Sequence, residues 1–251
     1  MRYVDKQSLP ELLSEAAELL AGSNDYNEQV RVRDILRLIY SGCCAYCGSA
    51  PEAASYFQIE HFYPKDSGGA YAAYEKDIRN LHYSCQRCNN LKRSAFHPNI
   101  FSPNYYLSNN QWMHGKAEKI DQELYYIGHL LYSRNKTNTV DRGEATIKQF
   151  DLNNQNGSGR SNRAYLVEAR IKIYDQVYQL TDALFQLIQE DRPSNKPIIR
   201  LLFLRLIRYT SPESPYSQMV IQNFGTSLLQ LLEIFHLQNL KERGHKTFPQ
   251  A

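Results

Sequence analysis

Two short stretches decide the fold: Cys44-Ala45-Tyr46-Cys47 and Cys85-Gln86-Arg87-Cys88-Asn89-Asn90-Leu91-Lys92. Each contains a Cys-x-x-Cys pair, and this spacing allows both sulfur atoms to reach one metal ion about 2.3 Å away. Two pairs complete a tetrahedral site, so we predict a structural zinc ion held by Cys44, Cys47, Cys85 and Cys88. Residues 48–84 are too many for a simple zinc ribbon or finger, so we expect a further element between the pairs.

Three other interpretations of the cysteines stay open. Cys43 could replace Cys44, although its spacing to Cys47 is the less common one. One pair could be redox-active, but neither lies in the strand-helix context of a thioredoxin-like site. All four could be buried thiols without a metal ion, in which case their spacing would be a coincidence.

The insert carries the candidate catalytic residues. It contains Ile59-Glu60-His61-Phe62-Tyr63-Pro64-Lys65, and Arg79-Asn80-Leu81 follows before the second cysteine pair. The acidic residue and histidine, the Asn-Leu pair and the Cys-x-x-Cys-Asn-x-x-Lys sequence, in this order, resemble the HNH (ββα-metal) nuclease family. Each piece is weak alone, whereas all of them together within residues 42–95 form a specific pattern.

The resemblance implies a role for each residue. His61 would be the general base that takes a proton from the attacking water, because a neutral imidazole with a pKa near 6.5 is available at cellular pH. Glu60 and Asn89 would be ligands of a catalytic Mg²⁺ or Mn²⁺ ion, which prefers oxygen atoms and neutralises charge on the leaving oxygen. The Asn80 amide would orient the His61 ring, and zinc would hold two strands and a helix in register.

Two positions depart from the commoner family pattern. Glu60 stands where Asp is more usual, and its additional methylene would shift the metal ion and favour Mn²⁺ or slow the reaction. Asn89 stands where many members have His, and Asn90 stays open as an alternative ligand. Considered alone, a Glu-His pair is usually a surface or core histidine, and Asn89 is an ordinary helix cap.

Composition and charge favour a nucleic-acid partner without requiring one. The chain has 251 residues, a net charge of +3 and 22% charged residues. Residues 78–100 and 192–212 carry only basic charges, and we predict that Arg87, Lys92 and Arg93 bind phosphate groups. The sequence lacks both a run of about 20 apolar residues and the apolar segment of a secretory signal, so we expect a soluble, cytoplasmic protein that does not enter a membrane.

The remaining patterns predict an α+β fold that is mostly helical. We expect helices at 12–21, after a Ser8–Glu11 capping box, and at 28–40, then strands at 56–62 and 81–84. A short helix at 71–78, a strand pair at 124–132 turning near Gly128, and helices at 166–187 and 198–209 are also expected. A last helix would begin at Ser214-Pro215 with a break near Gly225. Four parts follow: a helical segment 1–41, the nuclease core 42–95, an aromatic-rich, partly β connecting region 96–159, and a helical domain 160–251.

Softer motifs resemble one branch of the HNH family, the PtuB-like proteins associated with retrons and with the Septu anti-phage system. They are Met1-Arg2-Tyr3-Val4-Asp5-Lys6, the Ile59-Glu60-His61-Phe62 form of the core, Ala145-Thr146-Ile147 with Leu152-Asn153 ahead of a long helix, and Ser214-Pro215-Tyr216-Ser217. HNH components of other defence systems, such as Zorya, are the alternative. The resemblance implies an effector nuclease that works with an ATPase partner docked on the C-terminal helices. The ordinary alternative is that these helices pack only on each other and on the core.

Taken together, the patterns predict metal-dependent hydrolysis of DNA. A zinc-stapled nucleic-acid-binding or adaptor protein without turnover is one alternative, and an HNH nuclease acting on RNA is the other.

Overall fold

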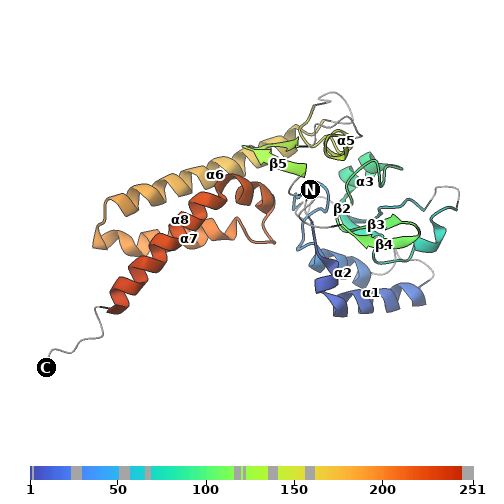
Figure 1. Cartoon of the computed structure of the whole chain (residues 1–251), viewed down its shortest axis with the longest axis horizontal. Coiled ribbons are helices and arrows are strands. Elements are labelled where there is room, and N and C mark those ends of the chain that lie inside the picture. Colours follow the sequence, from blue (N-terminus) through green and yellow to red (C-terminus); the bar gives the residue numbers. More distant parts are fainter. Residues whose placement is uncertain are drawn as a thin grey trace.

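The computed structural model describes residues 1, 3–23, 30–50, 57–65, 69–115, 120, 123–134, 141–155 and 162–244, with side chains up to 234 in the last range. It shows a globular part, which contains the short strands, and a long helical arm that extends from it (Figure 1). Within the described ranges, no helix has the length and apolar character needed to span a membrane. The predicted α+β, mostly helical fold is confirmed.

The N-terminal segment forms the 3-10 helix η1 (Lys6–Ser8) and the helices α1 (Pro10–Gly22) and α2 (Val30–Ile39). Helix α2 buries the face predicted from its spacing, which includes Val32, Ile35 and Leu36. The predicted capping box is wrong. Ser8 belongs to η1 and its hydroxyl donates to the Asp5 carbonyl oxygen, so α1 begins without a side-chain cap. The predicted start of the second helix, residue 28, lies outside the described residues.

The core has the ββα order. Strand β1 (Phe57–His61) pairs antiparallel with β2 (Leu81–Cys85), so that Glu60 lies opposite His82, and α3 (Gln86–Lys92) follows directly. The expected helix at 71–78 is reduced to the 3-10 turn η3 (Ala72–Tyr74). The Asp77 side chain accepts the Arg79 backbone N–H at 2.9 Å, and this local turn competes with a helix.

Two hairpins and a helix occupy the connecting region. The pair β5 (Leu124–Ile127) and β6 (Leu130–Ser133) turns at Gly128, which has a φ of +58°, so this prediction is confirmed. The hairpin β3 (Tyr105–Ser108) and β4 (Gln111–His114) was not expected. Its turn is Asn109-Asn110, with both residues at positive φ, which asparagine tolerates and a type I′ two-residue hairpin requires. Helix α5 (Arg142–Gln149) is followed by Phe150, whose ring stacks on Tyr46 at 4.4 Å between centroids.

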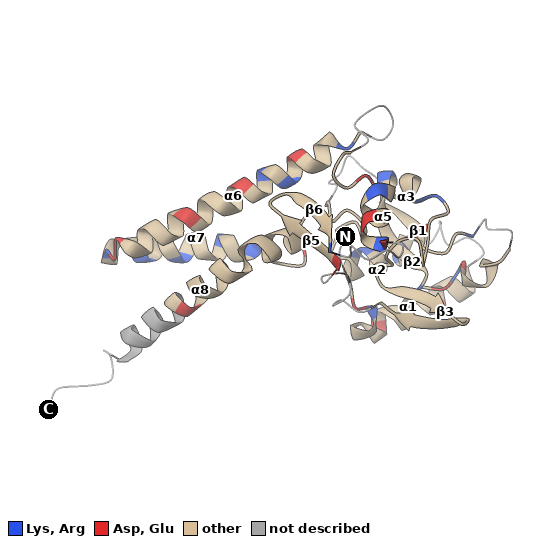
Figure 2. Cartoon of the chain, turned by 45° about the horizontal axis from the view of Figure 1, so that its top comes forward, with Lys and Arg blue, Asp and Glu red and all other residues tan. Residues whose placement is uncertain are grey.

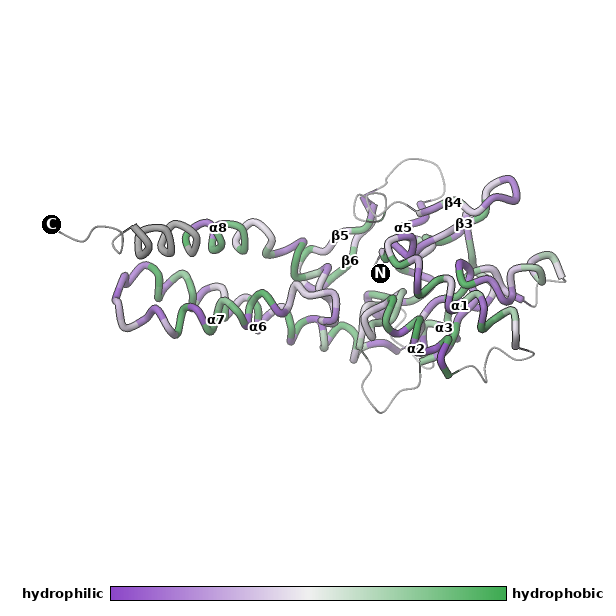
Figure 3. Tube along the Cα trace, turned by 90° about the horizontal axis from the view of Figure 1, so that it is seen from below, coloured by the Kyte–Doolittle hydropathy of each residue, from purple (hydrophilic) through white to green (hydrophobic). Residues whose placement is uncertain are grey.

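The arm consists of α6 (Ala164–Gln189), the turn η5 (Pro193–Asn195), α7 (Lys196–Arg208) and α8 (Ser217–Gly244). Hydrophobic and hydrophilic segments alternate along these helices, as expected when each helix buries one face against its neighbours (Figure 3). The predicted break near Gly225 is wrong, because α8 continues through it. Phe224 and Leu228 on either side are buried, and this packing offsets the roughly 1 kcal/mol that a helical glycine costs.

The arm is joined to the globular part through the β5–β6 hairpin. The Gln222 side chain accepts the Tyr126 backbone N–H at 2.7 Å. Asn223 exchanges two bonds of 2.9 Å with the backbone of Gly128. These contacts cross the expected boundary between the connecting region and the helical domain. The division of the chain into four parts stays a prediction.

Candidate active site and metal centre

The four predicted cysteines come together. The sulfur atoms of Cys44, Cys47, Cys85 and Cys88 all lie within 4.8 Å of one another, and all four residues are buried. Backbone N–H groups point at two of them, because Cys44 accepts from Cys85 and Cys85 accepts from Cys88, both at 3.4 Å. Cys43 stands outside this cluster, with its sulfur 3.8 Å from the Glu213 carbonyl oxygen. One ion could therefore be held by the set that the sequence predicts.

A buried arginine accompanies the cysteine cluster. Arg163, which is fully buried, donates from Nη1 to the sulfur of Cys88 at 3.3 Å and to the Phe150 carbonyl oxygen at 2.6 Å. A guanidinium group here compensates part of the negative charge that four thiolates would concentrate around a divalent ion. No sequence pattern connects Arg163 with the cysteines, because it lies far along the chain from them and matches no motif.

The candidate catalytic residues line one cavity of about 480 Å³. It contains Glu60 and His61 from the end of β1 and Asn89 from α3. The other lining residues are Arg33, Phe57, Gln58, Ile59, Pro64, Lys65 and Arg93. The strand and the helix thus bring together three of the four residues expected to carry the chemistry.

The contacts of the His61 ring define its tautomer. Nε2 lies 2.9 Å from the Glu75 carbonyl oxygen, which can only accept a hydrogen bond, so Nε2 carries the proton and Nδ1 carries the lone pair. Burial lowers the pKa of His61 from the ordinary 6.5, although the bond to Glu75 partly opposes this shift. His61 is therefore neutral at pH 7, as a general base must be.

Glu60 is held by two buried partners. Only 2% of its side chain is exposed, and its carboxylate lies 2.8 Å from Lys92 Nζ and accepts a hydrogen bond from the Tyr46 hydroxyl. Lys92 is 1% exposed and also donates to the His61 carbonyl oxygen at 2.8 Å. The prediction that Lys92 binds phosphate is wrong, because α3 packs this residue against the hairpin beside Glu60.

The two asparagines of α3 differ in exposure. Asn89 is half-buried, lines the cavity and donates from Nδ2 to Gln58 Oε1 at 2.6 Å, so its carbonyl oxygen Oδ1 is the atom suited to a metal ion. Asn90 is exposed and is not among the residues that line the cavity. Of the two alternatives left open by the sequence, the geometry favours Asn89.

Asn80 acts on the backbone around the site. Its Oδ1 accepts the Tyr63 N–H at 2.8 Å, and its Nδ2 donates to the carbonyl oxygens of Tyr63 and Tyr74, each at 3.1 Å. The expected direct contact between the Asn80 amide and the His61 ring is therefore replaced. The Glu75 carbonyl binds the ring, and Asn80 holds the adjoining Tyr74 in place.

Replacing Asn80 by aspartate is expected to lower the free energy of unfolding by about 3 kcal/mol, because a buried oxygen would then face two carbonyl oxygens. Urea denaturation measures this change. Asn90→Asp is the control, since the same chemical change at an exposed position should stay within about 0.5 kcal/mol. Equal losses in the two variants would contradict the role assigned to Asn80.

Basic residues around the cavity differ from those expected. Arg93 is exposed and lines it, whereas Arg87 is not among the lining residues and donates to the Asn162 carbonyl oxygen at 2.7 Å. Arg33 and Lys65, which were not expected at the site, also line it. Lys65 follows His61 closely enough to have been considered, but no sequence signal connects Arg33 with the site.

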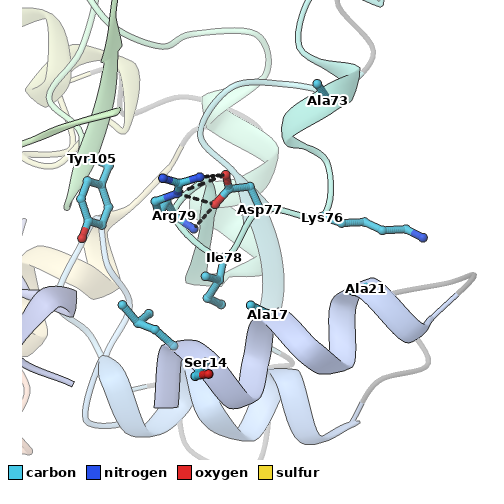
Figure 4. Close-up of a pocket in the computed structure, with 10 residues that line it drawn as sticks. Ser14, Ala17, Ala21, Ala73, Lys76, Asp77, Ile78, Arg79 and Tyr105 are labelled. Carbon is cyan, nitrogen blue, oxygen red and sulfur yellow. Dashed lines mark hydrogen bonds and ion pairs between the residues drawn. The ribbon is translucent and has the colours of Figure 1, made fainter. Parts of the chain in front are cut away.

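A second cavity, of about 560 Å³, lies between α1 and residues 73–79 (Figure 4). None of the predicted site residues lines it. Arg79 is paired with Asp77 at 2.6 Å, and Lys76 donates to the Ser23 carbonyl oxygen. Since its main charges are already partnered, this cavity offers less for catalysis than the one beside His61.

Comparison with known families agrees with the ββα order of the core and with the cavity beside it. Residues 44–95 match the family model described as HNH endonuclease. Across a longer range, the chain is 28% identical over 247 residues to the Septu protein PtuB of Bacillus mycoides (strain KBAB4), covering 82% of this chain and 77% of that protein.

Proposed function

We propose that this protein is a metal-dependent endonuclease that hydrolyses DNA in the cytoplasm as the effector of an anti-phage defence system. The observation that carries the proposal is the cavity in which His61, Glu60 and Asn89 meet Arg33, Lys65 and Arg93. A base and two oxygen ligands for a divalent ion can catalyse phosphodiester hydrolysis, and the three cations can bind phosphate groups. The similarity to a Septu protein supports the defence role.

The residues of the cavity would share the chemistry as follows. Nδ1 of His61 takes a proton from the attacking water, while the Glu75 carbonyl keeps the ring in place through Nε2. Glu60 and the Oδ1 atom of Asn89 would hold a Mg²⁺ or Mn²⁺ ion, which supplies positive charge at the leaving oxygen. Both ligand atoms are oxygens, which a hard cation prefers, and the Glu60 carboxylate would bind the ion through a lone pair that Lys92 and Tyr46 do not use. Zinc at the four cysteines would be structural.

Cleavage of supercoiled plasmid tests the proposal. The wild-type protein should nick or linearise it in Mg²⁺ or Mn²⁺ and not in EDTA, and His61→Ala should reduce the rate by about 10²–10⁴-fold because the general base is lost. His129→Ala, in the β5–β6 turn, is the control and should retain activity. Cleavage that survives His61→Ala would contradict the mechanism, and binding without cleavage in every condition would favour the adaptor alternative.

RNA remains the second candidate substrate, since the same base and metal ion serve either backbone. Competition of unlabelled RNA and DNA against plasmid cleavage separates the two.

We also propose that a partner ATPase docks on the helical arm. The docking proposal is supported by the outer face of α7, where the exposed Ile198, Leu201 and Leu204 lie among basic residues. Leu201 is 68% exposed. Helix α7 carries no acidic residue, and basic residues are spaced along it (Figure 2).

A further inference from the structure

Helix α2 contributes a side chain to the cavity although it lies outside the HNH segment 44–95. Arg33 lines the cavity together with β1 residues. The helix that carries it is firmly anchored, because Val32, Ile35 and Leu36 are fully buried. The position of Arg33 beside the site is therefore set by the hydrophobic core.

The cavity follows β1 along its whole length. Phe57, Gln58, Ile59, Glu60 and His61 are consecutive residues that all line it. Consecutive side chains point to opposite faces of a strand, so a cavity lined by all of them runs along the strand edge. Among the described residues, β2 is the only strand that pairs with β1. At about 3.3 Å per residue the edge spans about 13 Å, so it can contact more than one phosphate of a nucleic-acid strand.

The charge along this edge is positive. Among the described residues that line the cavity, Arg33, Lys65 and Arg93 are the cations and Glu60 is the only acidic residue. The negative charge of Glu60 is already matched by Lys92. The cavity therefore carries an excess of positive charge that suits a polyanion.

Arg33 and Arg37 of α2 lie near Tyr83 of β2. Burial raises the pKa of the Tyr83 phenol, and the nearby Arg37 and Arg33 guanidinium groups counteract part of that rise. Tyr83 pairs with Ile59, two residues before His61. Arg33 thus reaches the cavity beside the hairpin, whereas His61 is the last residue of β1. Since His61, Glu60 and Asn89 would act on the phosphate being cleaved, Arg33 suits a neighbouring phosphate of the same strand.

A second arginine of α2 provides a contrast. Arg31 Nε lies 2.6 Å from Glu15 of α1, so its charge is already partnered. No ion pair links Arg33 to any residue in the part of the chain that the structure describes. The two arginines are exposed on the same helix but only Arg33 lines the cavity.

We infer that Arg33 is a positioning residue that binds a substrate phosphate adjacent to the scissile one, so that α2 is part of the nucleic-acid-binding surface. This inference rests on the proposed nuclease function. It implies that the substrate strand extends from His61 toward Phe57, along the edge of β1.

Binding of a labelled 20-base-pair DNA duplex to the His61→Ala protein, across a salt series, tests the inference. Adding Arg33→Ala should weaken binding about tenfold and reduce the slope of log Kobs against log salt by about one, because one phosphate contact is lost. Arg33→Lys keeps the charge and should retain most of the slope. Arg31→Ala should leave both affinity and slope unchanged. In the active protein, Arg33→Ala should raise KM for plasmid DNA and leave kcat nearly unchanged.

The outcomes separate the two hypotheses. If Arg33→Ala binds with unchanged affinity and slope while the wild type cleaves plasmid, the inference about Arg33 is wrong and the nuclease function stands. If the wild type neither binds nor cleaves DNA or RNA, the proposed function fails and the inference fails with it.

Discussion

Replacing Cys88 by serine is expected to abolish folding of the globular part, because it breaks the cluster in which four sulfur atoms lie within 4.8 Å of one another. Structural zinc contributes about 10–16 kcal/mol of apparent binding free energy in zinc-finger peptides. That is as large as the whole stability of a typical domain, about 5–15 kcal/mol. Treatment of the wild type with a strong zinc chelator should have the same effect.

Trp112 provides the readout, since it is the only tryptophan in the chain and its indole N–H donates to Asp77 at 3.0 Å within the globular part. Its fluorescence should shift to longer wavelength when zinc is lost, and elemental analysis should find one zinc per wild-type chain. Cys43→Ser is the matched control, because Cys43 is buried beside the cluster but is not part of it. A Cys88→Ser protein that keeps its zinc and its fluorescence would refute the metal centre.

Replacing Lys92 by methionine is expected to lower the free energy of unfolding by about 3–5 kcal/mol, because the carboxylate of Glu60 is left buried without its cation. The two groups are 2.8 Å apart and both are almost fully buried. The change also removes the bond from Lys92 to the His61 carbonyl oxygen, so activity should fall together with stability. Urea denaturation measures the stability loss.

A double variant tests whether the unpaired charge of Glu60 causes the stability loss. Glu60→Gln combined with Lys92→Met removes both charges, so it should recover much of the lost stability although it lacks activity. Lys148→Met is the matched control, since Lys148 and Glu144 form an exposed pair at 3.4 Å that should be worth less than about 1 kcal/mol. If Lys92→Met costs no more than Lys148→Met, the buried pair does not stabilise the fold as described.

The features of the fold that could be predicted from the sequence are those that depend on residues close together in the chain. The spacing within each cysteine pair, the strand that ends at His61 and the long helix α6 depend on neighbours a few residues away, and all three are present. The site as a whole depends on distant contacts that no spacing reveals. Lys92 matches a family motif, yet only the packing of α3 on the hairpin shows that it neutralises Glu60. Arg33 and Arg163 reach their sites from residues far outside the motifs.

The beginnings of two arm helices touch the cysteine cluster. Arg163, directly before α6, binds the sulfur of Cys88, and the Tyr216 N–H, directly before α8, donates to the Gly48 carbonyl oxygen at 3.1 Å beside Cys47. Helix α6 has 26 residues and so is about 39 Å long. The base of this long arm, the cysteine cluster and the cavity are thus linked by one short segment, because Cys88 is followed in the chain by Asn89.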